Sequence, residues 1–339
     1  MFISKITLGA AQLGQNYGIS NIHGKPDLNI SIDILKYSWD HGINAYDTAP
    51  SYGNSEEIIG SFISSNIKSD LKNLIIVSKL PKIEDKGDLT FDRLYTIIKS
   101  ILIQSLKILH IDKFPFYLIH HAPDILLKDG IVVECLNQIK KEELIDQIGI
   151  SIYNPEEAET SLKFKEIDAI QLPINIFDHR LIKTRLLKKL KDHNYTIFAR
   201  SIYLQGLIFK SPETLPKNFG ITKEILLRLH RLCNEYNIDI SKLALLFVRD
   251  IPEIDSLVIG AEKVEQVADN LNIIKDDPLD HNLRKQIFEE FHDKWETFTM
   301  KEVINFIEEN QDLKSINIEY KRNEGLAKSL REDKEINNN

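Results

Sequence analysis

Hydrophobic and polar positions along the chain follow two periods that alternate with each other. Short runs rich in β-branched and aromatic residues are typical of buried strands, and the longer stretches between them repeat apolar residues at spacings of three and four, as amphipathic helices do. The predicted strands are KITLG (5–9), INAYD (43–47), LIIVSK (74–79), FPFYLIH (114–120), LIDQIGIS (144–151), IDAIQL (167–172), YTIFARS (195–201) and DSLVIG (255–260). Eight strand–helix repeats indicate a parallel sheet with right-handed crossovers.

The helical stretches carry recognisable start signals. Ser31, with Asp33 close by, is the expected N-cap of the first long helix, and Asn154 precedes Pro155 at the start of a later one. The clearest helical patterns cover 31–42, 55–65 and 90–109. These signals support the strand–helix alternation.

Two architectures fit such an alternation, an open doubly wound sheet and a closed barrel. The open sheet normally begins with a glycine-rich phosphate turn, and no G-x-G-x-x-G follows the first strand. We therefore predict a (β/α)₈ (TIM) barrel over residues 1–275. The alternation then stops, and we predict a helical extension over 276–315 and a polar, disordered tail over 316–339, where charges are many and large apolar residues few.

Composition narrows the range of partners. The chain has 339 residues, 42% of them hydrophobic, and a formal net charge of -8, which argues against nucleic acid or an anionic membrane surface as a partner. No apolar run approaches the roughly 20 residues that span a bilayer, and the first residues lack the pattern of a secretion signal, so we expect a cytoplasmic protein. The sequence gives no indication of oligomeric state.

Cysteine and histidine usage bears on metals and redox chemistry. Cys135 and Cys233 are the two cysteines, both within helical patterns, which supports neither a disulfide framework nor a thiolate metal site. His120 and His121 are adjacent, but no further His or Cys recurs at ligand spacing. We predict no metal site.

Polar residues end most of the predicted strands. In a closed parallel barrel the active site lies at the C-terminal ends of the strands, so these side chains are expected to share one face. They are Asp47, Lys79, His120, Ser151, Gln171, Arg200 and Gly260.

Three successive strand ends carry the groups that carbonyl reduction needs. Hydride arrives at carbon while charge grows on oxygen, so a proton donor must face that oxygen. Tyr52, five residues after Asp47, is the candidate donor; the pKa of free tyrosine is about 10, and lowering it by three units takes about 4 kcal/mol. An ammonium about 4 Å away at an effective dielectric of about 20 supplies roughly that energy, so Lys79 is the candidate activator. Asp47 would hold Lys79, and His120 would donate a second hydrogen bond.

Each of these residues alone has an ordinary structural explanation. A tyrosine in a loop is usually structural, a strand-end Asp often caps the next helix, and a lone Lys is commonly solvated. Their combination at three neighbouring strand ends favours catalysis.

At these residues the chain resembles the aldo/keto reductase family. The resemblance runs from residue 5 to about 273, and its motifs occur in family order: LGAAQLGQNYGI, GINAYDTAPSYGNSEEIIG, FYLIHHAPD, IGISIYNPEE, IQLPINIFD, ARSIYLQGLI and LVIGAEKVEQVADNL. It implies that Asp47, Tyr52, Lys79 and His120 form a catalytic tetrad. It also implies a nicotinamide cofactor held along the strand ends without a Rossmann domain.

The resemblance assigns further residues to that cofactor. Ser151 and Gln171 match side chains that bind the nicotinamide carboxamide, while Ile152 replaces a family asparagine. Arg200 stands where many members have a tyrosine stacked on nicotinamide, and a guanidinium plane can stack too. The match to the pyrophosphate loop comprises Ser201, Leu204 and Gly206.

The nucleotide end departs from the pattern of the best-known members. Gly260 and Ala261 open the last barrel helix, whose N–H groups suit a phosphate, and the positions matching the 2′-phosphate and adenine contacts are Gln266, Asp269 and Asn270. Gly260 and Gln266 replace a common Lys and Arg, and Glu262 adds an anion that Lys263 offsets. NADP(H) is the preferred cofactor, with NAD(H) as the alternative.

The resemblance implies an NAD(P)H-dependent oxidoreductase that converts an aldehyde or ketone to an alcohol. A barrel that binds cofactor but serves as a regulatory or sensor subunit is the alternative, and a barrel hydrolase or lyase without cofactor is a third. The predicted substrate pocket, polar and aromatic in a way that suits a sugar or small aldehyde, is lined by Gln12, Tyr17, His121 and Tyr153.

Overall fold

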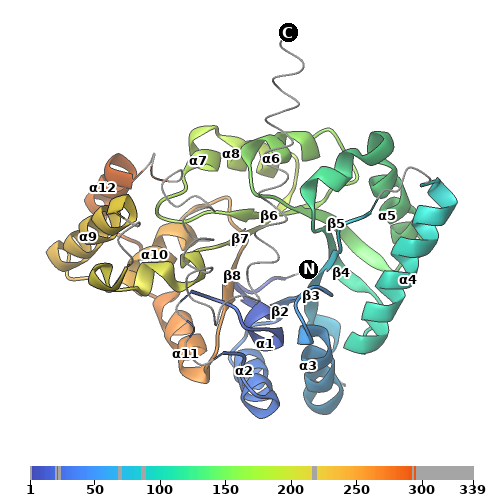
Figure 1. Ribbon diagram of the computed structural model, residues 1–339, viewed down its shortest axis with the longest axis horizontal. Coiled ribbons are helices and arrows are strands. Elements are labelled where there is room, and N and C mark those ends of the chain that lie inside the picture. The colour runs from blue at the N-terminus through green and yellow to red at the C-terminus, as the bar shows by residue number, and fades with distance from the viewer. Residues whose placement is uncertain are drawn as a thin grey trace, which may run out of the picture.

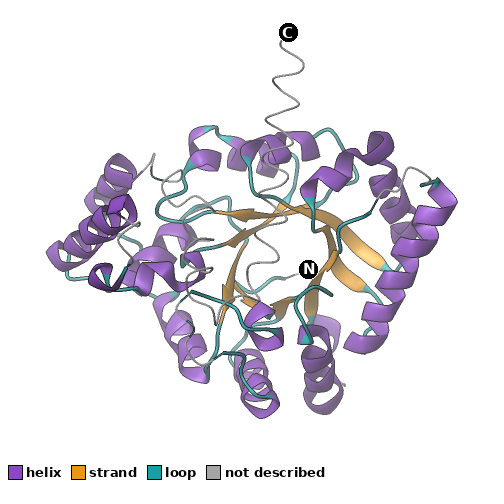
Figure 2. Cartoon of the chain, in the orientation of Figure 1, coloured by secondary structure: helices purple, strands orange, loops and turns teal. Residues whose placement is uncertain are grey.

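The protein folds as a closed eight-stranded parallel barrel surrounded by helices. A computed structural model describes residues 2–19, 21, 24–67, 71–84, 89–215, 220–291 and 294. Each strand pairs in parallel with the next along the chain, and β8 returns to pair with β1. Looking down the barrel, the strands form a central ring and the helices an outer one (Figures 1 and 2). The predicted (β/α)₈ barrel is confirmed.

All eight predicted strands are present, with ends that differ by at most a few residues. Four of them are buried at every position and the other four at most positions, as a sheet covered by helices on its outer face requires. The strands are β1 (Ile6–Gly9), β2 (Ala45–Asp47), β3 (Ile75–Leu80), β4 (Phe114–Ile119), β5 (Ile145–Ser151), β6 (Ala169–Pro173), β7 (Thr196–Arg200) and β8 (Ser256–Gly260).

The helices of the described residues fill the stretches between strands. Those following β1 to β4 are α1 (Ala11–Gly14), α2 (Leu28–Asp40), α3 (Ser55–Phe62), α4 (Phe91–Leu109) and α5 (Ile131–Lys141). Those following β5 to β8 are α6 (Pro155–Ser161), α7 (Arg180–Lys183), α8 (Leu186–Asp192), α9 (Gly220–Glu235), α10 (Ile240–Arg249), α11 (Val264–Ile273) and α12 (His281–Phe291). Short 3₁₀ and π segments are η1 (Ile63–Ile67), η2 (Leu71–Asn73), η3 (Ala122–Gly130), η4 (Leu204–Phe209) and η5 (Pro212–Thr214).

The predicted N-cap of α2 is wrong. The helix begins earlier than expected, at Leu28, and the Asp27 carboxylate caps it by accepting a hydrogen bond from the Ile30 N–H at 2.9 Å. Ser31 lies inside the helix and is fully buried. Asp27 lies one turn before Ser31 and its carboxylate satisfies a backbone N–H of the first turn, so the helix already includes Ser31 and needs no cap there.

The barrel interior is filled by side chains from alternating strand positions. An inner cluster comprises Ala45, Ile75, Val77, Phe116, Leu118, Ala169 and Phe198. The rings of Phe116 and Phe198 meet edge to face at 5.1 Å, and the hydroxyls of Thr7 and Ser256 are 2.7 Å apart. The interior is therefore a packed core rather than a pore.

This packing also fixes which strand-end side chains face inward. Successive side chains of a strand point to opposite faces, so a residue two positions beyond an inner residue also faces the interior. Six strand-end residues stand two positions after a residue of this inner cluster or after Val258, which packs against it. They are Asp47, Lys79, His120, Gln171, Arg200 and Gly260. The sequence thereby places these residues in one ring at the C-terminal mouth of the barrel.

A larger apolar layer lies between the strands and the outer helices, and α12 is part of it. Leu283, Ile287 and Phe291 of α12 are buried in the same cluster as the barrel helices. Phe291 meets Phe177 at 5.3 Å, and Phe288 lies 4.7 Å from the ring of the fully buried His179. Residues 276–291 thus pack on the barrel, and the rest of the predicted helical extension after 294 and the predicted tail over 316–339 lie outside the described residues.

Candidate active site

An ion pair between Asp47 and Lys79 lies at the centre of the barrel mouth. Lys79 Nζ donates to Asp47 Oδ1 at 2.7 Å and to the Thr48 carbonyl at 3.1 Å, and both side chains of the pair are almost completely buried. Gln171 Nε2 donates to the same Oδ1 at 2.7 Å. Asp47 thus fixes the buried ammonium from β3 and the amide from β6, and a buried pair with such added hydrogen bonds is positioned rigidly.

Two glycines bring Tyr52 close to this pair. Gly53 has a φ of +60°, which is unfavourable for any other residue, and a Cβ on it would collide with the Gly14 carbonyl of α1. A Cβ on Gly14 would in turn collide with the Tyr52 carbonyl. The turn after β2 therefore lies directly against α1, which explains why glycines stand at these positions of the motif.

The motif residues after Tyr52 anchor the turn from its other side. The hydroxyls of Thr48 and Ser55 are 2.6 Å apart. The buried Glu56 carboxylate accepts hydrogen bonds from Ser78 and Ser105, each at 2.9 Å. Removal from water raises the pKa of Glu56, against the two hydroxyl donors that lower it. These contacts join α3 to β3 and α4, so the end of the Y-G-x-S-E block supports the turn and does not face the mouth.

Tyr52, Lys79 and His120 converge. Lys79 Nζ lies 4.8 Å from the centroid of the Tyr52 ring, and the ring of Tyr52 meets that of His120 edge to face at 5.7 Å. Both aromatic side chains are half-buried, so they line the mouth and remain reachable from it. A phenol, an ammonium, a carboxylate and an imidazole therefore share one small volume, as the predicted tetrad requires.

His120 has an environment that keeps its imidazole neutral. Removal from water, together with the charges of Lys79 and Arg200 and then of His121, lowers the pKa of His120 to about 3. Its Nδ1 lies 3.5 Å from Ser51 Oγ, which is at the limit of a hydrogen bond. A neutral ring can donate one hydrogen bond to a substrate oxygen without adding a further positive charge.

We expect His120→Asn to make folding less sensitive to acid. The pKa of His120 in the folded protein lies below its value of about 6.5 in the unfolded chain. Below pH 6.5 the unfolded chain therefore takes up a proton at His120 that the folded protein does not, and the free energy of unfolding falls as pH falls from 6.5 toward 3. At pH 5 the loss is about 2 kcal/mol, at 1.36 kcal/mol per pKa unit. Urea unfolding at pH 7.5 and 5 should show a larger acid loss for the parent than for His120→Asn. An equal loss of unfolding free energy in the two proteins would contradict the assignment. His110→Asn is the control, because His110 is exposed and already has a left-handed conformation that Asn tolerates.

Arg200 lies across the mouth toward the end of β5. Its Nη2 donates to the Ile152 carbonyl at 2.9 Å and its Nη1 to Ser201 Oγ at 3.1 Å. The guanidinium lies 4.3 Å from the centroid of the Tyr153 ring. Arg200 and Tyr153 thus form a cation–π pair near Ser151, which is buried and pairs in register with Gln171.

A second arginine that the sequence analysis missed holds Tyr153 in place. Arg180, at the start of α7, donates to both carboxylate oxygens of the buried Asp178 at 2.9 and 2.8 Å. It also donates to the Tyr153 carbonyl at 3.0 Å and to Asn154 Oδ1 at 3.3 Å. The loop after β6 is thereby tied to the loop after β5. The I-N-I-F-D-H-R stretch contained the Asp–Arg spacing but gave no sign of which loop it would reach.

The loop after β7 has an unusual backbone. Ser201, Leu204 and Gln205 all have positive φ, at 63°, 49° and 55°, and Gly206 follows at 88°. Left-handed residues other than glycine are costly and cluster where function requires them. The Gln205 carbonyl accepts a hydrogen bond of 2.7 Å from Ile19 N, which joins this loop to the one after α1. Three of these residues belong to the predicted pyrophosphate loop.

Gln12, in α1, lies beside the end of β8 and also close to the loop that carries Tyr17. Its Nε2 donates to Glu262 Oε1 at 3.2 Å, and a side chain at Gly260 would collide with its amide. It therefore contacts residues predicted for the nucleotide end. The Gln266 side chain accepts a hydrogen bond from Glu262 N at 2.7 Å, so it covers one N–H of the turn before α11.

The remaining residues of the nucleotide end differ in exposure. Ala261 is buried, Lys263 is an exposed residue at the N-cap position of α11, and Asp269 is exposed on that helix. Asn270 is buried, and its Oδ1 accepts a hydrogen bond of 2.7 Å from the Tyr203 hydroxyl. Tyr203 is a second residue that sequence reasoning missed, because nothing in its loop indicated a contact with α11.

The other predicted pocket residues lie on the rim. Tyr17 is half-buried in the loop after α1. His121 Nδ1 lies 2.7 Å from Asp124 Oδ1, and Asp124 Oδ2 accepts from Ile83 N at 2.8 Å. Within the described part of the chain, the buried His121 Nε2 has no hydrogen-bond partner. The His–Asp pair therefore orients the imidazole next to His120.

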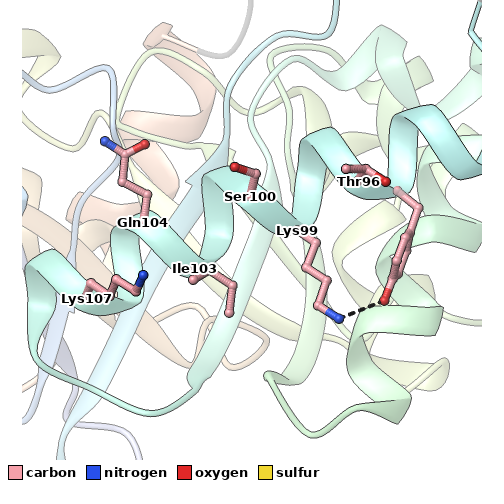
Figure 3. A pocket seen from close by; sticks show the side chains of 7 residues that line it. Thr96, Lys99, Ser100, Ile103, Gln104 and Lys107 are labelled. Carbon is pink, nitrogen blue, oxygen red and sulfur yellow. Dashed lines mark hydrogen bonds between the residues drawn. The ribbon is translucent and has the colours of Figure 1, made fainter.

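A groove of about 400 Å³ lies on the outer face of α4, lined by Tyr95, Thr96, Lys99, Ser100, Ile103, Gln104 and Lys107 (Figure 3). All of these belong to one outer helix and none to a strand end, so the groove is separate from the barrel mouth.

Across residues with described positions, no cluster of three or more His, Cys, Asp or Glu is arranged to hold a metal ion, and no helix is long and apolar enough to cross a membrane.

Comparisons of the sequence with a family model and with known proteins indicate the same family. The model of the aldo/keto reductase family matches residues 5–289. An uncharacterized oxidoreductase, YqkF of Bacillus subtilis, is 27% identical over 79% of this chain and 86% of its own length. The NADH-specific methylglyoxal reductase of Escherichia coli is 28% identical over 79% and 89%, and the D-arabinose 1-dehydrogenase of Saccharomyces cerevisiae 25% identical over 86% and 93%.

Solved structures show the same fold. An aldo-keto reductase from Bacillus halodurans in its holo form superimposes with a TM-score of 0.66 at 20% identity, covering 86% of this chain and 93% of that one. An aldo/keto reductase from Klebsiella pneumoniae in complex with NADP and acetate has a TM-score of 0.63 at 20% identity, covering 85% and 92%.

Proposed function

Because this chain belongs to the aldo/keto reductase family and is an oxidoreductase, we propose that it reduces an aldehyde or ketone to an alcohol with NAD(P)H, using Tyr52 as the proton donor. The observation that carries the proposal is the convergence of Tyr52, Lys79 and His120 at the barrel mouth, around the Asp47 carboxylate. NADP(H) is the proposed preference, as in the Klebsiella pneumoniae complex, with NAD(H) as the alternative, as in the Escherichia coli relative.

The residues present fit such a cofactor. A carboxamide offers both a donor and an acceptor, which the Ser151 hydroxyl and the Gln171 side chain match, and both are buried at the mouth. The left-handed backbone of the loop after β7 is strained as ligand-binding loops often are. Gln12 and Gln266 both contact Glu262 in the turn before α11, so we propose that Gln12 serves the nucleotide end in addition to the substrate pocket.

Each tetrad residue has a distinct part in the proposed chemistry. When bound, the reduced nicotinamide supplies a hydride to the carbonyl carbon. Tyr52 donates its phenolic proton to the carbonyl oxygen, and the Lys79 ammonium stabilises the phenolate that remains. Asp47 holds Lys79 in position, and the neutral His120 donates a hydrogen bond to the same oxygen.

The substrate we propose is a sugar or a small sugar-derived carbonyl. Tyr17, Tyr153 and His121 give the rim aromatic surface and a polar imidazole, which together suit a hydroxylated chain. Two of the relatives, the arabinose dehydrogenase and the methylglyoxal reductase, are named for an aldose and a small aldehyde.

Cofactor binding is the first test. NADPH or NADH should raise the melting temperature, because a ligand that binds the folded state alone stabilises it by about 2.7 kcal/mol at 100 times its Kd. ATP at equal concentration is the control for binding through the adenine nucleotide alone. No shift with either nicotinamide nucleotide at millimolar concentration would refute the proposal.

Turnover is the second test, and it separates an enzyme from a sensor. A panel of aldehydes and keto-sugars should include at least one that oxidises the bound cofactor over many turnovers. Tight cofactor binding without turnover on any of them would favour the regulatory barrel.

A further inference from the structure

We propose that the Arg200 guanidinium makes the site bind the reduced form of the cofactor more tightly than the oxidised form. The inference rests on the proposed function, in which the nicotinamide ring binds beside Ser151 and Gln171. It goes further by assigning to one residue a preference between the two redox states of the ring.

The position of Arg200 is set by the barrel. It stands two residues beyond the inner residue Phe198, so its side chain starts toward the interior at the mouth. From there the guanidinium donates a hydrogen bond of 2.9 Å to the carbonyl of Ile152, the residue directly after Ser151. It therefore crosses above the ends of β6 and β5, where Gln171 and Ser151 pair in register.

Three contacts hold the guanidinium in this place. Its Nη2 and Nη1 atoms donate to the Ile152 carbonyl and to Ser201 Oγ, and its Cζ lies 4.3 Å from the centroid of the Tyr153 ring. Tyr153 is itself fixed through Arg180, whose charge is matched by two hydrogen bonds to Asp178. Arg200 is therefore a fixed charge and not a mobile surface side chain.

The positive charge of Arg200 acts on His120, another residue of the barrel mouth. Its field is one of the causes that lower the pKa of His120, after removal from water and the charge of Lys79. Lys79 itself forms an ion pair with Asp47 at 2.7 Å, which reduces its effect at longer range. Arg200 thus adds positive potential on the side of the mouth where the nicotinamide is proposed to lie.

The two redox states of the nicotinamide ring differ by one positive charge. The reduced ring is neutral; when it gives a hydride to the carbonyl carbon, two electrons and a proton leave together and the ring becomes cationic. A fixed guanidinium nearby repels the cationic form and is almost indifferent to the neutral one, because charge–charge repulsion acts on the former alone. The site would therefore take up the reduced cofactor in preference to the oxidised one and release the oxidised product readily, while the hydride-transfer equilibrium on the protein shifts toward the reduced cofactor by the same factor.

Dissociation constants of the two redox states test this directly, without turnover. We expect titration calorimetry of the wild-type protein to give a Kd for NADP⁺ at least about tenfold above that for NADPH, a difference of about 1.4 kcal/mol. Arg200→Gln should bring the two constants within about threefold of each other, mainly by tightening NADP⁺. Arg200→Lys keeps the charge and should keep most of the wild-type ratio.

Several results would overturn the inference. Equal affinities of the wild-type protein for NADPH and NADP⁺ would do so whether or not the variants fold. A ratio unchanged in Arg200→Gln would also overturn it, as would a ratio lost equally in Arg200→Lys, which would assign the effect to stacking. If the wild-type protein binds none of NADPH, NADP⁺, NADH and NAD⁺, the proposed function itself is wrong, and this failure is distinct from binding without redox preference.

Discussion

Tyr52→Phe should lower the rate of carbonyl reduction by about 10²–10⁴-fold while cofactor binding survives. Losing a general acid typically costs this much, and phenylalanine keeps the ring that packs edge to face on His120. The Lys79 ammonium, 4.8 Å from the ring centroid, would then have no phenolate to stabilise. Single-turnover rates, measured with preformed protein–cofactor complex, isolate the chemical step from substrate binding and product release.

Tyr95→Phe is the matched control for this experiment. Tyr95 lies on the outer helix α4, where its hydroxyl bonds to Glu142, so its loss should leave single-turnover rates unchanged. If Tyr52 were merely structural, Tyr52→Phe would lower the free energy of unfolding with little change in rate per folded molecule. Rates within about threefold of the parent would rule out Tyr52 as the donor.

Asp47→Asn should destabilise the protein by about 3–5 kcal/mol. Removing one partner of a buried ion pair leaves the other charge buried without compensation, which costs this amount. The side chains of Lys79 and Asp47 are 0% and 5% exposed, so water cannot replace the missing carboxylate. The free energy of unfolding from denaturant titration gives the size of the loss.

A second substitution tests whether the buried charge is the cause. Lys79→Met added to Asp47→Asn removes the ammonium, so the double variant should recover most of the lost stability while remaining inactive. Asp192→Asn is the control, because its pair with Lys188 is 60–70% exposed and should contribute less than about 1 kcal/mol. A double variant no more stable than Asp47→Asn would show that the loss arises from altered packing or from the Gln171 contact, and not from the ammonium.

The barrel could be predicted from the sequence because its signals are local and repeated. Each strand is a short apolar run between helical stretches, and eight repeats reinforce one another, so an error of a residue at one end changes nothing in the topology. The N-cap of α2 shows the limit of a single local signal. Both Asp27 and Ser31 can cap a helix, and the packing that buries Ser31 decides between them.

The ring of inward side chains could also be predicted, because it follows from strand ends and alternation. The loop contacts could not. Gln12 and Glu262 are in contact although their positions in the sequence differ by 250. Tyr203 contacts Asn270 from a loop in which Ser201, Leu204 and Gln205 have a positive φ that their residue types do not favour. Such partners depend on backbone conformations that composition and spacing leave undetermined.

The packing of α12 has a consequence for how the chain is made. Ribosomes deliver the eight strands before the helix that covers Phe177, His179 and Phe247, so a nascent barrel carries an exposed aromatic surface until Phe288 and Phe291 emerge. Exposed surfaces of this kind promote aggregation of partly folded chains. A chain that ends near 275 would leave that surface permanently open, whereas a chain that reaches 291 carries the residues that cover it.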